Sequence, residues 1–165
     1  MYEYRGKKLI EYAIQAMKPV AREILISTNN PGDYAFTGFK TIPDIYPNHG
    51  PLSGIHSGLS NSLCDWNLIV GCDMPSLTIT LFEFILANAN DYQVVYPTHN
   101  GFTESMMGFY NRSSLPVIET ALKHRTNKIL SAVAPLKVLF LNVDDQDFYD
   151  FKIFRNINSI EDLDF

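Results

Sequence analysis

The sequence predicts an α/β protein with three layers, in which a mostly parallel sheet lies between two layers of helices. Two observations support this fold class. Short apolar segments typical of strands alternate along the chain with helical patterns of about 10–15 residues, as in βαβ units. The strand segments are nearly continuous apolar runs, which is typical of strands buried on both faces. No linker or repeat divides the 165 residues, so we expect a single domain spanning residues 1–165.

The first third of the chain predicts one helix and two strands. Apolar residues recur at helical spacing over residues 9–17, and Pro19 ends that helix. The apolar run at residues 23–27 predicts a strand, which the turn-forming segment 29–33 closes. A short strand over residues 40–45 follows.

The remaining chain continues this alternation after a helix that ends at Asn61. The predicted elements are, in order, strand 66–71, helix 77–88, strand 91–97, strand 106–110, helices 114–123 and 128–134, and strand 137–143. The dipeptide Asn100-Gly101 is typical of a hairpin turn and leads into the strand at residues 106–110.

Composition excludes several classes of protein. Thirteen Lys and Arg residues are scattered among eighteen Asp and Glu residues, a net charge of −5 that does not favour nucleic-acid binding. Two cysteines, Cys64 and Cys72, are too few for a disulfide scaffold and lack metal-binding spacing. The sequence contains no apolar run near the ~20 residues that cross a bilayer and no apolar signal-peptide core at its start. We therefore expect a cytoplasmic protein without a membrane partner.

In such folds ligands bind beyond the carboxyl ends of the strands, so we expect the site after these ends, near Asn29, Asp73, Pro97 and Asn142. Asp73 follows an apolar strand in the segment Gly71-Cys-Asp-Met-Pro-Ser-Leu77. A carboxylate fixed there can hold Mg²⁺ against phosphate oxygens. An alternative role, as a turn or cap residue before the next helix, stays equally open.

Other motifs have both a structural and a functional interpretation. The glycines of Gly50-Pro-Leu-Ser-Gly54 let a backbone approach a ligand closely near a helix start, although such a segment is more often a plain loop. Asn158 or Ser159 is placed to cap a short C-terminal helix. The acidic run at residues 144–150 is interpreted as a solvated loop. The four histidines are unclustered, which argues against a metal cage or a catalytic triad.

Taken in order, the motifs resemble those of the molybdenum cofactor guanylyltransferase family over nearly the whole chain. The matching segments are Tyr4-Arg-Gly-Lys-Lys-Leu-Ile10, Glu23-Ile-Leu-Ile-Ser-Thr-Asn29, Gly50-Pro-Leu-Ser-Gly-Ile55, Cys72-Asp-Met-Pro-Ser-Leu77, Gly108-Phe-Tyr110 and Asn156-Ile-Asn-Ser-Ile-Glu-Asp-Leu163. The resemblance implies a Rossmann-like nucleotidyltransferase that joins GMP from GTP to molybdopterin-bound molybdenum, releases pyrophosphate and uses Mg²⁺. It implies GTP and molybdopterin as substrates, and other molybdenum cofactor enzymes as partners.

The resemblance also implies roles for individual residues. Asp73 is the implied catalytic residue and metal ligand, and it also belongs to the nucleotide site. The other implied nucleotide-binding residues are Asn29, Asp44, Gly50, Pro51, Leu52 and Gly54. Asn156 and Asn158 are implied to line the molybdopterin side.

The sequence departs from the family at two places. The family's opening strand and glycine-rich loop, which grips the triphosphate, have no counterpart, because the resemblance starts at about Tyr2. We therefore expect exposed sheet edges, poor GTP binding and weak or absent transfer of GMP by these 165 residues. The second departure is Glu104-Ser-Met, where the family usually has a proline after the acidic or polar residue. Two alternatives stay open: a related nucleotidyltransferase that uses CTP or a sugar phosphate, and a non-catalytic protein that binds a pterin or a partner.

Overall fold

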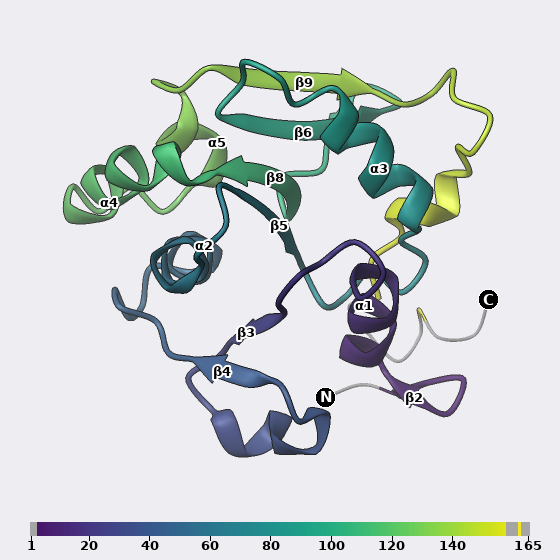
Figure 1. Cartoon of the computed structure of the whole chain (residues 1–165), viewed down its shortest axis with the longest axis horizontal. Coiled ribbons are helices and arrows are strands. Elements are labelled where there is room, and N and C mark those ends of the chain that lie inside the picture. Colours follow the sequence, from purple (N-terminus) through teal and green to yellow (C-terminus); the bar gives the residue numbers. More distant parts are fainter. Residues whose placement is uncertain (1–2, 158–161, 163–165) are drawn as a thin grey trace.

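The computed structural model describes residues 3–157 and residue 162 (Figure 1). The strands are β1 (Glu3–Tyr4), β2 (Lys7–Lys8), β3 (Leu25–Ser27), β4 (Lys40–Ile42), β5 (Trp66–Val70), β6 (Val94–His99), β7 (Phe102–Thr103), β8 (Met107–Asn111) and β9 (Val138–Asn142). The α-helices are α1 (Leu9–Met17), α2 (Pro51–Asn61), α3 (Ile79–Ala87), α4 (Leu115–Lys123) and α5 (Ile129–Val133). Short 3₁₀ helices η1 (Pro31–Thr37), η2 (Arg112–Ser114) and η3 (Phe151–Phe154) join them. The predicted α/β class is confirmed.

The largest sheet has five strands and is mixed rather than mostly parallel. β8 lies between β5 and β6 and is antiparallel to both, whereas β9 pairs with β6 in parallel. The reversal arises at Asn100 and Gly101, whose φ angles of 48° and 78° form the predicted hairpin turn between β6 and β7. The chain then returns antiparallel to β6 as β8.

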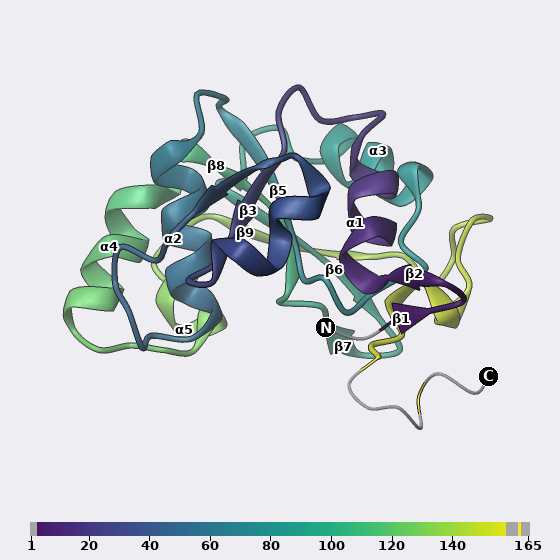
Figure 2. The same cartoon turned by 90° about the horizontal axis from the view of Figure 1, so that it is seen from below.

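Two helical layers cover this sheet, as Figure 2 shows with α2, α4 and α5 on one side and α1 and α3 on the other. Side chains alternate between the faces, so Val94 and Tyr96 pack against the α2, α4 and α5 layer while Val95 packs against α3 and η3. The hydroxyls of Tyr96 and Tyr110 share a buried hydrogen bond of 2.7 Å inside the first layer. The two hydrophobic cores, one on each face of the sheet, hold the strands and therefore their ends in place.

A second, smaller sheet consists of β3 and β4, which pair in parallel. Figure 1 shows it apart from β5, with α1 and α2 on the two sides of the intervening space. The segment 66–71 was expected to be fully buried, but every residue of β5 is only partly buried. The reason is that one edge of β5 faces this space, whereas the interior strands β6 and β8 carry the most buried side chains. Within the described residues, none of the helices has the length and apolar character needed to span a membrane.

Candidate functional site

The site begins where β3 and β4 end, at a reciprocal pair formed by Asn29 and Asp44. The Asn29 side-chain amide donates to a carboxylate oxygen of Asp44 over 2.9 Å, and the Asp44 backbone N–H donates to Asn29 Oδ1 over 3.0 Å. The hydroxyl of Ser27 donates to the other Asp44 oxygen over 3.4 Å. Both partners are accessible from solvent, so the pair can meet a ligand. The structure thus brings together two residues that the sequence placed on the nucleotide side.

The start of α2 supplies the next part of the site. Gly50 precedes the helix with a φ of 61°, a conformation that favours glycine, and Pro51 occupies the first turn. No side chain caps this end in the described structure. The first turn of the helix carries the positive end of the helix dipole, which favours an anion. Leu52 is fully buried in the core, so in this structure neither its side chain nor its backbone reaches the surface of the site. Gly54 lies one turn later, where an added Cβ would stand 3.3 Å from Ser27 Oγ.

Asp73 lies in the turn after β5 and carries an unusual carboxylate. Its Oδ1 is buried and has no hydrogen-bond partner in the described part of the chain. The cap interpretation is wrong, because Thr78 caps α3 by accepting from the Leu81 N–H over 3.4 Å. Gly71 leaves room for the carboxylate, since a Cβ there would stand 2.6 Å from Asp73 Oδ1. A buried acceptor that is left unpaired costs stability, so this one is a candidate for a ligand.

Asn156 reaches the same region from the C-terminal segment. The backbone N–H of Ile157 donates to the backbone oxygen of Asp73 over 2.8 Å, which ties the segment to the turn after β5. The side-chain Oδ1 of Asn156 is also buried and without a partner among the described residues. The side-chain oxygens of Asp73 and Asn156 are therefore two buried, unpaired acceptors on neighbouring segments. Asn158, predicted beside Asn156, lies outside the described residues.

Sequence reasoning missed a network around His99, at the end of β6. Its Nε2 and Glu104 Oε1 are 2.8 Å apart, and its Nδ1 is 3.2 Å from the hydroxyl of Tyr149. The imidazole stacks on Phe154 with 4.4 Å between ring centroids. The position after a strand was the available signal, but the partners are 5 and 50 residues away, too scattered for a motif.

The acidic run after β9 is more structured than the predicted solvated loop. The carboxylate of Asp144 accepts from the backbone N–H of Asn100 over 3.0 and 3.1 Å, which fixes the β6–β7 turn. Asp150 accepts from the Lys152 N–H over 2.9 Å and caps η3. These two carboxylates therefore hold the loops around the site, and only the others are free to be solvated.

Comparisons with known proteins agree on one family. The family model described as "MobA-like NTP transferase domain" matches residues 1–137. A protein named "Probable molybdenum cofactor guanylyltransferase" from Clostridium perfringens is 31% identical over 98% of this chain and 83% of its own length. One of the same name from Carboxydothermus hydrogenoformans is 33% identical over 83% of this chain and 69% of its own length.

A solved structure has the same fold. The crystal structure titled molybdopterin-guanine dinucleotide biosynthesis protein A, from Archaeoglobus fulgidus, superposes with a TM-score of 0.81 at 23% identity. The match covers 98% of this chain and 85% of that one. At this level of identity the likeness establishes the Rossmann-like nucleotidyltransferase fold, and the residue roles must be argued from the site itself.

Proposed function

This chain belongs to the family of MobA-like NTP transferase domains, and we propose on that basis that it is a molybdenum cofactor guanylyltransferase. The reaction joins GMP from GTP to molybdopterin-bound molybdenum. A phosphate oxygen of molybdopterin attacks the α-phosphorus of GTP in line, the bond to the bridging oxygen of the β-phosphate breaks, and pyrophosphate leaves. The chemistry needs positioning and charge neutralisation rather than a nucleophilic side chain.

The observation that carries this proposal is the unpartnered carboxylate oxygen of Asp73 at the end of β5. Asp73 follows Cys72, which lines the same cavity as Asn29 and Asp44, and its backbone oxygen accepts from Ile157, the residue after Asn156. The Asn29–Asp44 pair and the start of α2 lie on the β3 and β4 side, and Asn156 lies on the C-terminal side. A phosphoryl group held beside Asp73 can therefore be approached by an acceptor from the other side. We assign Asp73 the catalytic role.

The donor set at Asp73 fits a divalent cation, and we propose Mg²⁺. Mg²⁺ binds through one or two carboxylates together with substrate phosphates and retained waters, so one buried carboxylate oxygen suffices. When bound, the ion would neutralise charge on the phosphate oxygens. In this proposal Gly71 holds open the space for that carboxylate, because any side chain at this position would collide with it.

The base and the pterin are proposed to bind on opposite sides of Asp73. Guanine carries N–H groups that can donate hydrogen bonds to the carboxylate of Asp44. Asn29 holds that carboxylate in place. The start of α2, where the exposed Gly50 precedes Pro51 and the positive end of the helix dipole lies, favours the phosphates. On the acceptor side, the buried Oδ1 of Asn156 can accept a hydrogen bond from a pterin N–H. A cytoplasmic location and contact with other enzymes of molybdenum cofactor synthesis stay predictions from the sequence.

Nucleotide choice tests the proposed function against its CTP-using alternative. Pyrophosphate release is measured with GTP, CTP or ATP, in the presence of Mg²⁺ and molybdopterin, and again without molybdopterin. We expect release with GTP that depends on molybdopterin. The sequence predicts a low absolute rate, so the ratio between nucleotides is the quantity to measure. Equal release with CTP, or release that does not need molybdopterin, would contradict the proposal.

A further inference from the structure

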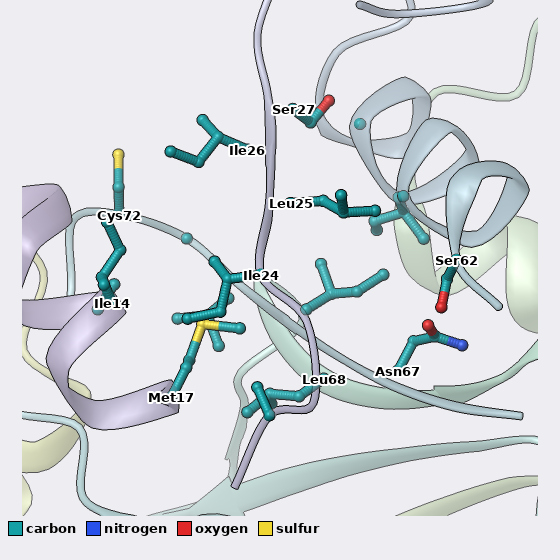
Figure 3. A pocket seen from close by; sticks show the side chains of 18 of the residues that line it. Ile14, Met17, Ile24, Leu25, Ile26, Ser27, Ser62, Asn67, Leu68 and Cys72 are labelled. Atoms are coloured by element: carbon teal, nitrogen blue, oxygen red, sulfur yellow. The ribbon is translucent and has the colours of Figure 1, made fainter. Parts of the chain in front are cut away.

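The two sheets have several strand edges without a described strand partner. Those of β3 and β5 face a cavity of about 650 Å³, which is lined by Leu25 and Leu68 among others (Figure 3). The resemblance to the family predicts these two open edges, because the family's opening strand has no counterpart in the sequence. It does not account for the open edge of β9, which lies at the rim of the large sheet (Figure 1).

Every second residue of β9 directs its backbone groups away from the sheet. Val143 donates its backbone N–H to Thr98 of β6, so the groups of Val143 point inward. Because successive residues of a strand direct their N–H and C=O groups to alternate edges, the outward-facing residues are Val138, Phe140 and Asn142. Among the described residues, β9 pairs with β6 alone.

β9 lacks the features that usually keep an exposed edge from pairing, which are shortness, proline, charged side chains and bulges. Its sequence Val-Leu-Phe-Leu-Asn contains neither proline nor a charge, and it pairs with β6 without a bulge through all five residues. The strands β4 and β7 also have open edges, but they are three and two residues long, and Pro43 directly follows β4. The edge of β9 is therefore suited to pairing with another strand.

Phe140 is a large apolar side chain at the centre of this edge. Its ring stacks on Tyr96 with 6.1 Å between centroids, yet 52% of the residue is exposed. Val138 lies on the same face of the strand and packs against the core beneath α2, α4 and α5. A strand added beside β9 would cover Phe140, and burial of this apolar surface would stabilise the pairing.

We propose that two copies of this chain pair antiparallel through β9, about a two-fold axis that passes at Phe140. In this register Phe140 lies opposite Phe140 of the second copy, and Val138 lies opposite Asn142 of the second copy. The outward-facing residues of each copy are then matched with those of the other, and antiparallel partners of this kind exchange both of their N–H···O bonds. The two Phe140 rings meet on one face of the joined sheet.

The charges that flank β9 favour a second copy over a strand of another protein. The exposed Lys137 precedes the strand, and Asp144 and the exposed Asp145 follow it. Antiparallel pairing brings the basic start of each strand to the acidic end of the other, so the chain supplies the complementary charge itself, twice by symmetry. β5 runs in the same direction as β9, so the strand ends that carry Asp73 point away from each other in the pair. This inference does not depend on the proposed catalytic function.

Sedimentation equilibrium of the 165-residue chain, from micromolar to millimolar concentration, tests the proposal. We expect a reversible equilibrium between monomer and dimer, in which amide exchange at Phe140 slows as the dimer forms while exchange at Val143 stays constant. Phe140→Lys sets two lysines opposite each other and should weaken the dimer at least about tenfold. The matched control is Phe102→Lys, at an exposed phenylalanine of β7, which should form dimers like the wild type.

A charge exchange tests the register without touching the core. Lys137→Glu or Asp145→Lys alone brings like charges together at both ends of the pair and should weaken the dimer about three- to tenfold. The double variant restores opposite charges and should restore the dimer. A chain that stays monomeric at millimolar concentration would overturn the proposal. A dimer that neither Phe140→Lys nor the single charge variants weaken would do so too, because it would use another surface.

Discussion

His56, on α2, is a buried histidine whose environment opposes its positive charge. Its Nδ1 has no hydrogen-bond partner among the described residues, and its ring meets the edge of Tyr46 with 5.0 Å between centroids. Burial lowers the pKa of His56 below its ordinary value of 6.5, and the charge of Glu119 offsets this only in part. In the native protein the imidazole is therefore neutral, and protonation acts against folding.

The stability of the protein should accordingly fall as the pH drops below about 6.5, where an unfolded histidine begins to bind its proton. Below that pH the unfolded state binds a proton that the folded state does not bind. The free energy of unfolding therefore falls by up to about 1.4 kcal/mol per pH unit. Replacing His56 with phenylalanine keeps a ring against Tyr46 and removes the titration. Urea curves at pH 5 to 8 give the free energy of unfolding of the wild type and of the variant. As the pH falls, the wild type should lose stability relative to the variant. A constant difference would contradict this assignment.

At the scale of single residues, the sequence predicted positions better than roles. Asn29 and Asp73 could be picked out because they follow predicted strands, and strand ends gather at one edge of a sheet. Asp44 lay inside a predicted strand and was implied only by the resemblance to the family. Whether Asp73 was a cap could not be read from the chain, because Thr78 is an equally good cap and only the structure shows which side chain bonds the helix. His99 was missed because its contacts to Glu104 and Tyr149 exist only after folding.

At the scale of elements, α2 lines the cavity of about 650 Å³ between the two sheets, and Gly58 lowers the stability of this helix. The residue lies within the helix, an added Cβ would meet nothing within 4 Å, and its φ is not positive. Glycine inside a helix costs about 0.5–1 kcal/mol relative to alanine, because the unfolded chain loses more freedom on folding.

Gly58→Ala should therefore raise the free energy of unfolding by about 0.5–1 kcal/mol. Gly38 is the matched control, because a Cβ there also meets nothing within 4 Å, but its φ is 71°. Gly38→Ala should destabilise the protein, since alanine is strained in that conformation. Chemical denaturation of the two variants measures both effects. The opposite order of stabilities would show that space rather than backbone conformation governs these positions.

Two predicted element boundaries differ from the structure, in each case because of one local residue. The strand expected at residues 40–45 ends at Ile42, since Pro43 follows it and cannot donate to a ladder. The helix expected from residue 77 begins at Ile79, after its Thr78 cap. The antiparallel insertion of β8 between β5 and β6 could not be predicted, because it depends on which strand edges meet after the hairpin.

At the scale of the whole molecule, a cavity of about 650 Å³ separates the small sheet from the large one. The two sheets differ in how many of their strand edges are paired. The β6 strand has partners on both edges, β8 and β9, whereas β3 has a described partner only in β4. The fold class followed from the alternation of strands and helices, but composition alone gave no sign of this division. It was expected only from the resemblance to the family.

Amide hydrogen exchange should report this difference directly. Backbone amides that face away from β4, such as those of Leu25 and Ser27, have no strand partner among the described residues and should exchange much faster than those of Val94 and Val95 in β6. Peptide-resolved mass spectrometry under native conditions measures both regions in one experiment. Protection of β3 equal to that of β6 would mean that the small sheet is as firmly held as the large one.

The most direct test of the central claim follows radioactive GMP from α-labelled GTP to molybdopterin in the wild type and in Asp73→Asn. In a version of the protein that also carries the family's glycine-rich opening, we expect labelled product from the wild type and at least roughly a hundredfold less from the variant, with unchanged circular dichroism and a melting temperature that is not lowered. Asp147→Asn, which alters an exposed carboxylate in the C-terminal loop, should transfer label like the wild type. Near-normal transfer by Asp73→Asn in the presence of Mg²⁺ would contradict the account.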